Sequence, residues 1–296
     1  MLFTSKNPQF EHLKKKWGGK QKAASENFLQ KHGETLRKAT IGGLGGLVLA
    51  TIPGGIAPVP TPQAIVQGIA KTEDKNVLLR EKLKGQLPEE VRKLTPEEEK
   101  NIETILSDNL GLNVKAELSG IRLNRSYGLI GGEQHLYRYP GDTLEKHADN
   151  TADWAMYGGS GIAPGLGAWG YFTSSEGNFT PEDKMRERYY LAVPTFLSPG
   201  FSENFGKYRD FYKFRKMLVV NPKTGQAVVA VVGDAGPAEW TGKHLGGSPE
   251  VMHYVGLAEG PRKGAVLYFF IDDPENKVPL GPINSSNNFL AMKGGS

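Results

Sequence analysis

Two apolar runs joined by a short turn constrain the fold of this chain more than any other feature. Residues 217–220 and 227–232 are rich in β-branched side chains, and residues 221–225 between them include a proline and a glycine that supply turn dihedrals. The pattern predicts a β-hairpin. Because the second run is apolar at every position, both of its faces should be buried. A Gly-Asp-Ala-Gly-Pro segment follows, which places the carboxylate of Asp234 where a buried strand ends.

The composition favours a loop-rich β protein over a helical one. The 296 residues include 38 glycines and 19 prolines. A chain of this length can bury one substantial core and carry appendages. There is no cysteine, which excludes a disulfide, a thiolate nucleophile and a cysteine-ligated zinc.

The positive charge lies mainly at the N-terminus. Residues 1–38 carry nine Lys or Arg against three acids, so the formal net charge of +4 leaves about −2 for the rest of the chain. A nucleic-acid-binding domain would be expected to show a basic face. We therefore predict a basic cytoplasmic tail over residues 1–38 and no nucleic-acid partner for the folded part.

An uncharged stretch, residues 39–59, follows this tail and is rich in glycine. Its length fits a bilayer span, and basic residues on one flank would hold that flank in the cytoplasm. We predict a transmembrane or signal-anchor segment here. A signal peptide cleaved near Ala57 or Ala70 is the close alternative, and a buried glycine-rich helix is a third. Either export interpretation makes the remainder extracytoplasmic, whether membrane-anchored or secreted.

The rest of the chain divides by composition into four further segments. Residues 60–100 are expected to be a linker and a solvated helical stalk. Thr95 and Pro96 predict the start of a helix that runs to about Asn109 and stops at Gly111. The predicted boundaries are a small α+β region at 101–157 with short strands, a main domain at 158–273, and a C-terminal tail at 274–296.

Two histidines and two aspartates are candidate metal ligands by residue type. They are His135, His147, Asp149 and Asp153. Their spacing matches no single helical face, which favours solvated surface residues. The sequence therefore predicts no metal and no cofactor.

Several motifs occur in an order that resembles a known family. They are Ala-Trp-Gly-Tyr at 168–171, Leu-Ala-Val-Pro at 191–194, the segment 225–237 ending in Asp-Ala-Gly-Pro, the Ser-Pro-Glu segment at 247–257, and the apolar run 265–270. The set is similar to the double-psi β-barrel of rare lipoprotein A, expansins and related lytic transglycosylases, and it covers about residues 158–273. The resemblance implies a mainly β fold with a six-stranded barrel and an open groove for cell-wall glycan, usually peptidoglycan.

The resemblance also assigns residues to this groove. Asp234 matches the family's Asp before Gly-Pro, whereas the family's second Asp is replaced by a stretch containing Lys243 and His244. Glu182, Asp183 and Glu187 lie in the region of a family acid and histidine cluster, although Tyr190 stands where a histidine is expected.

Glycan cleavage needs a group that protonates the leaving oxygen. Desolvation could raise the pKa of Asp234 for this role, with His244 as its partner. The alternative is that Asp234 caps a turn through local hydrogen bonds and that His244 is merely exposed.

Aromatic residues near the groove could stack on sugar rings. Trp169, Tyr171, Tyr190 and Trp240 are the candidates, with Glu187 as a polar contact. A further aromatic stretch, residues 201–214, is interleaved with Lys and Arg. It favours an inserted helix that packs on the barrel over a single-stranded nucleic-acid site.

Three hypotheses follow. The first is a membrane-tethered, extracytoplasmic protein that acts on peptidoglycan by lytic transglycosylase-like cleavage, with Asp234 as general acid. The second is a non-catalytic, expansin-like module that binds or loosens the wall. The third is a cytoplasmic nucleic-acid binder, based on the basic tail and residues 201–214.

Overall fold

The predicted hairpin is formed by β6 (Lys216–Val220) and β7 (Ala227–Ala235) in a computed structural model that describes residues 75–283. The strands pair antiparallel, and Val220 lies opposite Ala227 next to the turn. Gly225 closes the turn with a φ of 78°, a left-handed conformation that glycine adopts at little cost. The sequence prediction of a hairpin at this position is confirmed.

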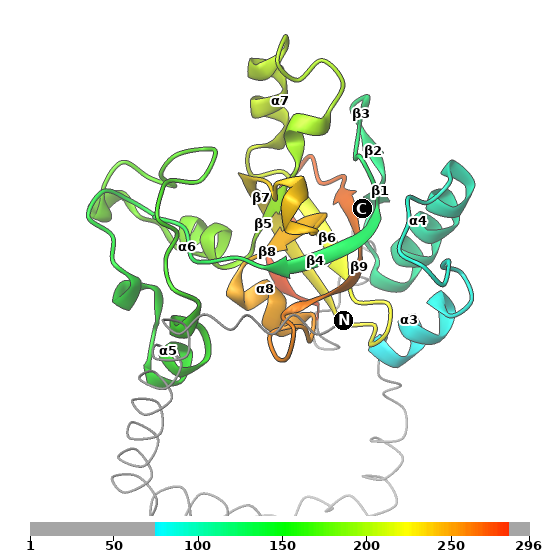
Figure 1. Cartoon of the computed structure of the whole chain (residues 1–296), viewed down its shortest axis with the longest axis horizontal. Helices are drawn as coiled ribbons and strands as arrows, with labels where there is room; N and C mark the ends of the chain where they lie inside the picture. Colours follow the sequence, from blue (N-terminus) through cyan, green and yellow to red (C-terminus); the bar gives the residue numbers. More distant parts are fainter. Residues whose placement is uncertain (1–74, 284–296) are drawn as a thin grey trace, which may run out of the picture. The chain divides into compact units, whose positions relative to one another are not determined.

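Six strands close into a barrel around this hairpin. The other four are β4 (Tyr127–Gly132), β5 (Tyr190–Val193), β8 (Leu245–Gly247) and β9 (Lys263–Ile271). The hydrogen-bonded order is β9-β4-β8-β5-β7, and β6 pairs with both β7 and β9 to complete the ring (Figure 1). The β4–β8 and β5–β7 pairs are parallel, and the other four are antiparallel. The chain is mainly β, as predicted.

Both faces of the barrel wall are buried along β6, β7 and β9. Met217 and Val219 belong to the cluster that fills the barrel, whereas Leu218 and Val220 belong to a second cluster on its outer side. The same alternation runs through β7 and β9. This explains why residues 227–232 are apolar at every position.

The outer cluster is covered by α3 (Lys75–Leu83) and α4 (Pro96–Leu110), which lie together on one side of the barrel (Figure 1). Thr95 accepts a hydrogen bond from the Glu98 N–H, and Gly111 ends α4 in a left-handed conformation, as predicted. The expectation of a fully solvated stalk does not hold for α3. Leu79 and Leu83 are buried against the barrel, because its outer wall is apolar and requires a cover.

The remaining elements extend the barrel at its edges and ends. Short strands are β1 (Val114–Lys115), β2 (Glu117–Leu118), β3 (Ile121–Arg122) and β10 (Gly281–Pro282). Helices are α5 (Thr151–Tyr157), α6 (Pro181–Arg188), α7 (Phe205–Tyr212) and α8 (Pro249–Tyr254). Single 3₁₀ turns are η1 (Leu144–His147), η2 (Gly158–Ser160), η3 (Glu176–Asn178), η4 (Thr195–Leu197) and η5 (Glu239–Thr241).

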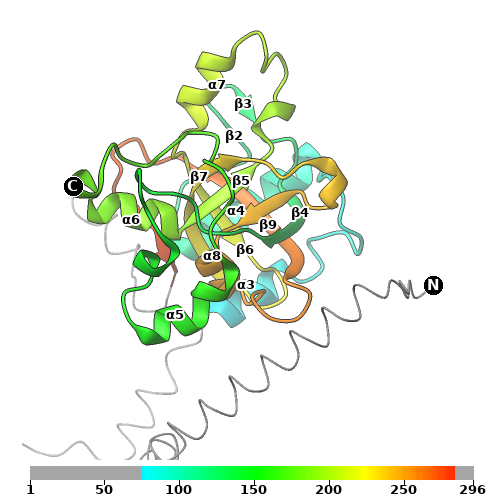
Figure 2. The same cartoon turned by 60° about the vertical axis from the view of Figure 1, so that its left-hand side comes forward.

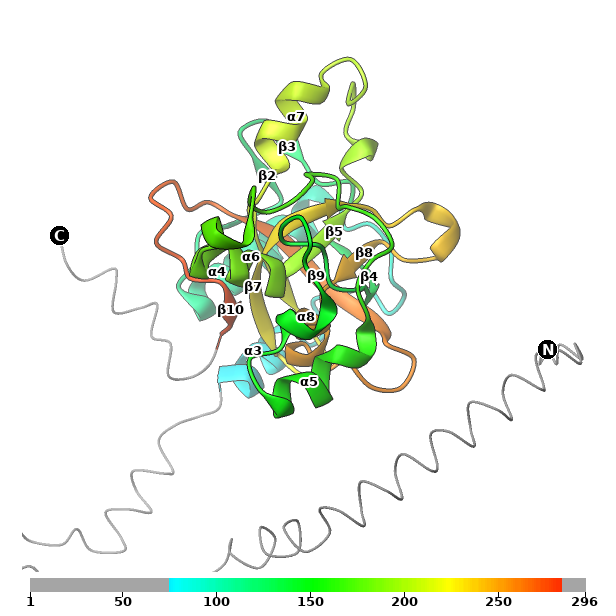
Figure 3. The same ribbon diagram turned by 90° about the vertical axis from the view of Figure 1, so that its left-hand side faces the viewer.

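Two of these features bear on the predicted boundaries. The strand β4 belongs to the barrel although it precedes residue 158, so the barrel is not confined to 158–273. The long connection from β4 to β5 carries α5 and α6, and α6 lies beside α8 (Figures 2 and 3). The aromatic stretch 201–214 contains α7, which buries Phe211 and Tyr212 against the barrel core.

The strand directions define two ends of the barrel. The starts of β4 and β8 lie at the same end as the finishes of β5 and β7. At the opposite end, β4 and β8 finish and β5 begins. Loops at these two ends hold different sets of polar side chains.

The predicted membrane segment, residues 39–59, lies outside the described residues. Within residues 75–283, no helix combines the length and the apolar character that crossing a bilayer requires.

Candidate functional site

A groove of about 450 Å³ opens at the end of the barrel where β4 and β8 begin. This volume is within the range of small-ligand sites. Its lining comes from loops beside four barrel strands and from the α3–α4 connection: Lys93, Asn124, Arg125, Pro194, Leu197, Pro237, Glu239, Gly242, Lys243 and His244. Basic side chains outnumber acidic ones in this lining, so the groove favours an anionic ligand.

Arg125 is the unpaired cation of this groove. Its Nε and Nη1 atoms are buried and have no hydrogen-bond partner within residues 75–283, and no described carboxylate forms an ion pair with it. By contrast, Lys243 pairs with Glu133 at 2.7 Å, and Lys93 donates to the Asn124 side chain at 2.7 Å. A partly buried guanidinium without a partner is costly, and an anion would relieve that cost.

His244 presents one defined ring nitrogen. Its Nδ1 accepts a hydrogen bond from the Leu129 N–H at 2.9 Å, so the ring proton of the neutral form is on Nε2. Burial, together with the charges of Arg125 and Lys263, lowers the pKa of His244. The side chain is therefore a neutral Nε2–H donor at pH 7.

Gly128 on β4 allows these two side chains to approach each other. A Cβ atom at this position would lie 2.9 Å from the His244 Cβ and 3.0 Å from the Arg125 Cδ. The absence of a side chain at Gly128 therefore leaves space for His244 and Arg125 beside β4.

Of the aromatic candidates, Trp240 lies next to the groove. It is in the same 3₁₀ turn as Glu239, and 88% of its surface is exposed. Trp169 is partly buried and donates its Nε1–H to the Val232 carbonyl at 3.1 Å. Tyr190 is buried and donates to the Gln134 carbonyl, and Tyr171 does not line the groove.

Asp234 is held by local backbone groups. Its Oδ1 accepts hydrogen bonds from the Ala168 N–H at 2.7 Å and the Ala235 N–H at 2.8 Å. Burial raises the pKa of Asp234, and these two N–H groups oppose the increase. No hydrogen bond or ion pair joins Asp234 to His244 among the described residues, so the predicted acid and its predicted partner are not brought together.

The opposite end of the barrel holds a buried histidine and carboxylate cluster. His135 and His147 are only 1% and 5% exposed, so the expectation that they are solvated is wrong. Both face Glu187, whose carboxylate lies 3.1 Å from His135 Nδ1 and 3.2 Å from His147 Nδ1. Glu187 therefore belongs to this cluster and does not line the groove.

Charge pairing offsets the burial of this cluster. Burial alone would raise the pKa of Glu187, but the hydrogen bond with His135 and the close approach of His147 lower it to about 2. Burial would likewise lower the pKa of His147, but Asp142 and Glu187 raise it to about 9. Without a bound metal ion, protonated His147 and ionised Glu187 form an ion pair.

Glu250 on α8 differs from the other acids of this end. Burial and the nearby charge of Glu187 raise the pKa of Glu250 to about 8. Its Oε2 has no hydrogen-bond partner within the described chain, and Arg188 approaches its Oε1 only to 3.9 Å. The other acids named from the sequence have local partners: Glu182 pairs with Arg186, and Asp183 caps α6.

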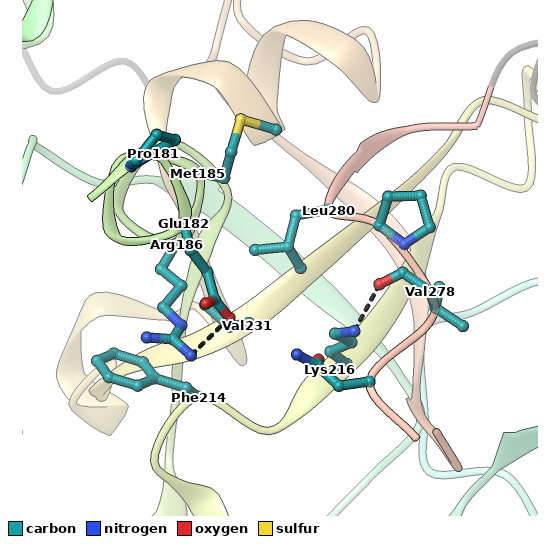
Figure 4. A pocket seen from close by; sticks show the side chains of 11 residues that line it. Pro181, Glu182, Met185, Arg186, Phe214, Lys216, Val231, Val278 and Leu280 are labelled. Carbon is teal, nitrogen blue, oxygen red and sulfur yellow. Dashed lines mark hydrogen bonds and ion pairs between the residues drawn. The ribbon is translucent and has the colours of Figure 1, made fainter. Parts of the chain in front are cut away.

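A second pocket of about 380 Å³ lies between α6 and residues 276–280 (Figure 4). Its cations are already paired. Arg186 donates to Glu182, and Lys216 donates to the Val278 carbonyl (Figure 4). Lys216 also pairs with Asp273 at 2.7 Å. The lining is otherwise largely apolar, so this pocket offers less to an anion than the groove at Arg125 does.

Sequence patterns did not single out Arg125, Lys93 or Asn124. They come from short connections without helical or strand periodicity, and they meet only because the barrel closes. The available signal for this site was the position of Arg125, a basic residue between two short strands. Comparisons with known protein families, with curated protein sequences and with solved structures found no match.

Proposed function

We propose that this chain is a double-psi β-barrel protein that binds an anionic cell-wall glycan, with peptidoglycan as the leading substrate class, in the groove beside Trp240. The observation that carries the proposal is the unpaired guanidinium of Arg125 in a groove with a net basic lining. Peptidoglycan carries carboxylates, and charge-assisted hydrogen bonds to carboxylates are the strongest that arginine makes.

The rim of the groove supports a sugar ligand. Trp240 is the most exposed of the large apolar side chains in the described part of the chain. An indole ring is suited to stack on the apolar face of a sugar while its edge stays in water. The Nε2–H of His244 adds a neutral donor for a hydroxyl or carboxylate oxygen.

The proposed double-psi topology and the proposed location at the cell wall are supported by the strand pairing and by the sequence, not by the groove. Two parallel strand pairs within a six-stranded closed barrel are compatible with a double-psi arrangement. The order of the motifs at 168–270 carries the resemblance to barrel proteins that act on the cell wall. The uncharged segment 39–59 supports an extracytoplasmic location, either tethered to the membrane or secreted.

Co-sedimentation with purified wall sacculi tests the binding proposal. Replacement of Arg125 by methionine should weaken binding about 10–100-fold, because it removes charge-assisted hydrogen bonds worth about 1.5–3 kcal/mol. Trp240→Ala should weaken binding about 3–10-fold. Arg209→Met and Phe205→Ala, which alter an exposed arginine and an exposed aromatic on α7, should bind as the wild type does. Equal binding by all five proteins, or no binding by the wild type, would overturn the proposal.

A second candidate function is cleavage of the glycan with Asp234 as general acid. The observation that favours it is the burial that raises the pKa of Asp234. Wild-type protein incubated with sacculi should then release soluble muropeptides, and Asp234→Asn should reduce the rate at least 100-fold or so. If the wild type binds sacculi without releasing product, or if Asp234→Asn releases product at the wild-type rate, the chain is a binding module only.

A further inference from the structure

Three side chains at the barrel end opposite the groove converge on one point. His135 follows β4, His147 ends η1, and Glu187 lies in α6 just before β5. One ligand atom from each lies within 4.8 Å of the others, and all three residues are buried. Two imidazoles and one carboxylate form a donor set that zinc enzymes and zinc-binding proteins use.

The contact between His147 and Glu187 has the spacing of two metal ligands. His147 Nδ1 lies 3.2 Å from Glu187 Oε2, yet this buried nitrogen has no hydrogen-bond partner in the described chain. A metal ion at this point would take the place of the His147 Nδ1 proton, because a ligating imidazole must be neutral. Donor atoms around a tetrahedral zinc ion lie about 3.3 Å apart, close to the spacing observed here.

The outer partners of His147 fix the ring in the orientation that metal binding needs. His147 Nε2 lies 3.0 Å from Asp142 Oδ2. Asp142 is in turn held by Arg138, which donates from Nε at 2.9 Å, from Nη2 at 2.7 Å and from its backbone N–H at 3.0 Å. A carboxylate that binds the distal nitrogen of a histidine is the usual second partner of a metal-bound imidazole, and it leaves the other nitrogen free to ligate.

A gap lined by His135, His147, Asp153 and Trp154 adjoins the cluster, but it has no room for a water molecule. An ion would therefore enter only when this cover opens, and Trp154, which is partly exposed, lies at its edge. With His147 neutral as a ligand, a divalent ion would offset the charge of Glu187, while Arg138 already offsets that of Asp142.

We propose that His135, His147 and Glu187 bind a Zn²⁺ ion, with water in the fourth position, and that this ion ties the long β4–β5 connection to the barrel. The three ligands come from the start, the first third and the end of residues 133–189, a connection whose helices are all short. A metal that links three points of such a connection reduces its conformational freedom, so zinc binding should stabilise the fold. This inference is independent of glycan binding.

Zinc titration of the full chain tests it. The purified protein is stripped with a chelator and titrated with Zn²⁺ in competition with a chromophoric chelator. We expect one equivalent to bind with a dissociation constant below about 1 µM, and the melting temperature to rise with zinc. Weaker binding combined with an unchanged melting temperature would overturn the proposal.

Variants assign the bound ion to this cluster among the six histidines of the chain. His147→Ala and Glu187→Gln should weaken zinc binding at least about 100-fold, and Asp142→Asn about 10–100-fold. His253→Ala, on α8 and outside the ligand set, should bind as the wild type does.

Circular dichroism verifies that each variant is folded. Wild-type affinity in folded His147→Ala or Glu187→Gln would place the ion elsewhere and refute the assignment. If both variants fail to fold, the zinc-dependent melting temperature of the wild type decides the question.

Discussion

Replacing Phe269 with alanine is expected to lower the free energy of unfolding by about 3–5 kcal/mol. The ring is fully buried on the outer side of β9, in the cluster that α3 and α4 contribute to. Removal of the ring leaves a cavity that a hydrogen-bonded barrel wall cannot collapse to fill. Urea unfolding followed by circular dichroism measures the change.

The matched control is Phe205→Ala, which removes a phenylalanine that is 49% exposed on α7 and should change the stability by less than about 0.5 kcal/mol. A loss below about 1 kcal/mol for Phe269→Ala would mean that α3 and α4 do not cover the barrel wall.

The second large effect concerns Glu250. Because burial and Glu187 raise its pKa from 4.5 to about 8 in the folded state, the folded protein holds a proton that the unfolded chain releases between these pH values. The stability linked to this proton is fully present below pH 4.5 and is lost as the pH rises through about 8. We expect wild-type stability to fall by about 2–4 kcal/mol across this window through this group alone.

Glu250→Gln should remove that pH dependence, so the difference in unfolding free energy between variant and wild type should grow in the variant's favour from pH 5 to pH 8. Urea unfolding at both pH values, in buffer with a chelator, gives this difference. Glu239→Gln, a substitution at an exposed glutamate beside the groove, should follow the wild type at both pH values. Parallel pH profiles for Glu250→Gln and the wild type would contradict the raised pKa.

The barrel wall could be predicted from the sequence because strand signals are local. The hairpin of β6 and β7 is predicted by two continuous apolar runs on either side of a turn, because each strand faces one apolar cluster inside the barrel and another outside it. The helix at Thr95 is predicted by its capping residues. The cover provided by α3 could not be predicted in the same way. Its nine residues bury only Leu79 and Leu83, which are too few to distinguish a packed helix from a solvated one.

The polar sites depended on long-range geometry. His135 and His147 are separated by irregular chain, and only the folding of the β4–β5 connection places both beside Glu187. Arg125 meets His244 because β4 and β8 are parallel neighbours, a pairing that no local pattern encodes. Asp234 was predicted at a strand end and lies there, but its hydrogen bond to the Ala168 N–H depends on a distant loop.

Hydrogen exchange of the full chain with soluble peptidoglycan fragments tests the proposed glycan groove most directly. We predict slower amide exchange at residues 124–129 and 237–245, which border Arg125, Trp240 and His244, and no change at residues 144–158 at the opposite end. Fragments with amidated carboxylates should give much weaker protection, because they lack the charge that Arg125 would bind. Protection confined to residues outside the groove, or equal protection by charged and amidated fragments, would contradict an anionic glycan site at Arg125.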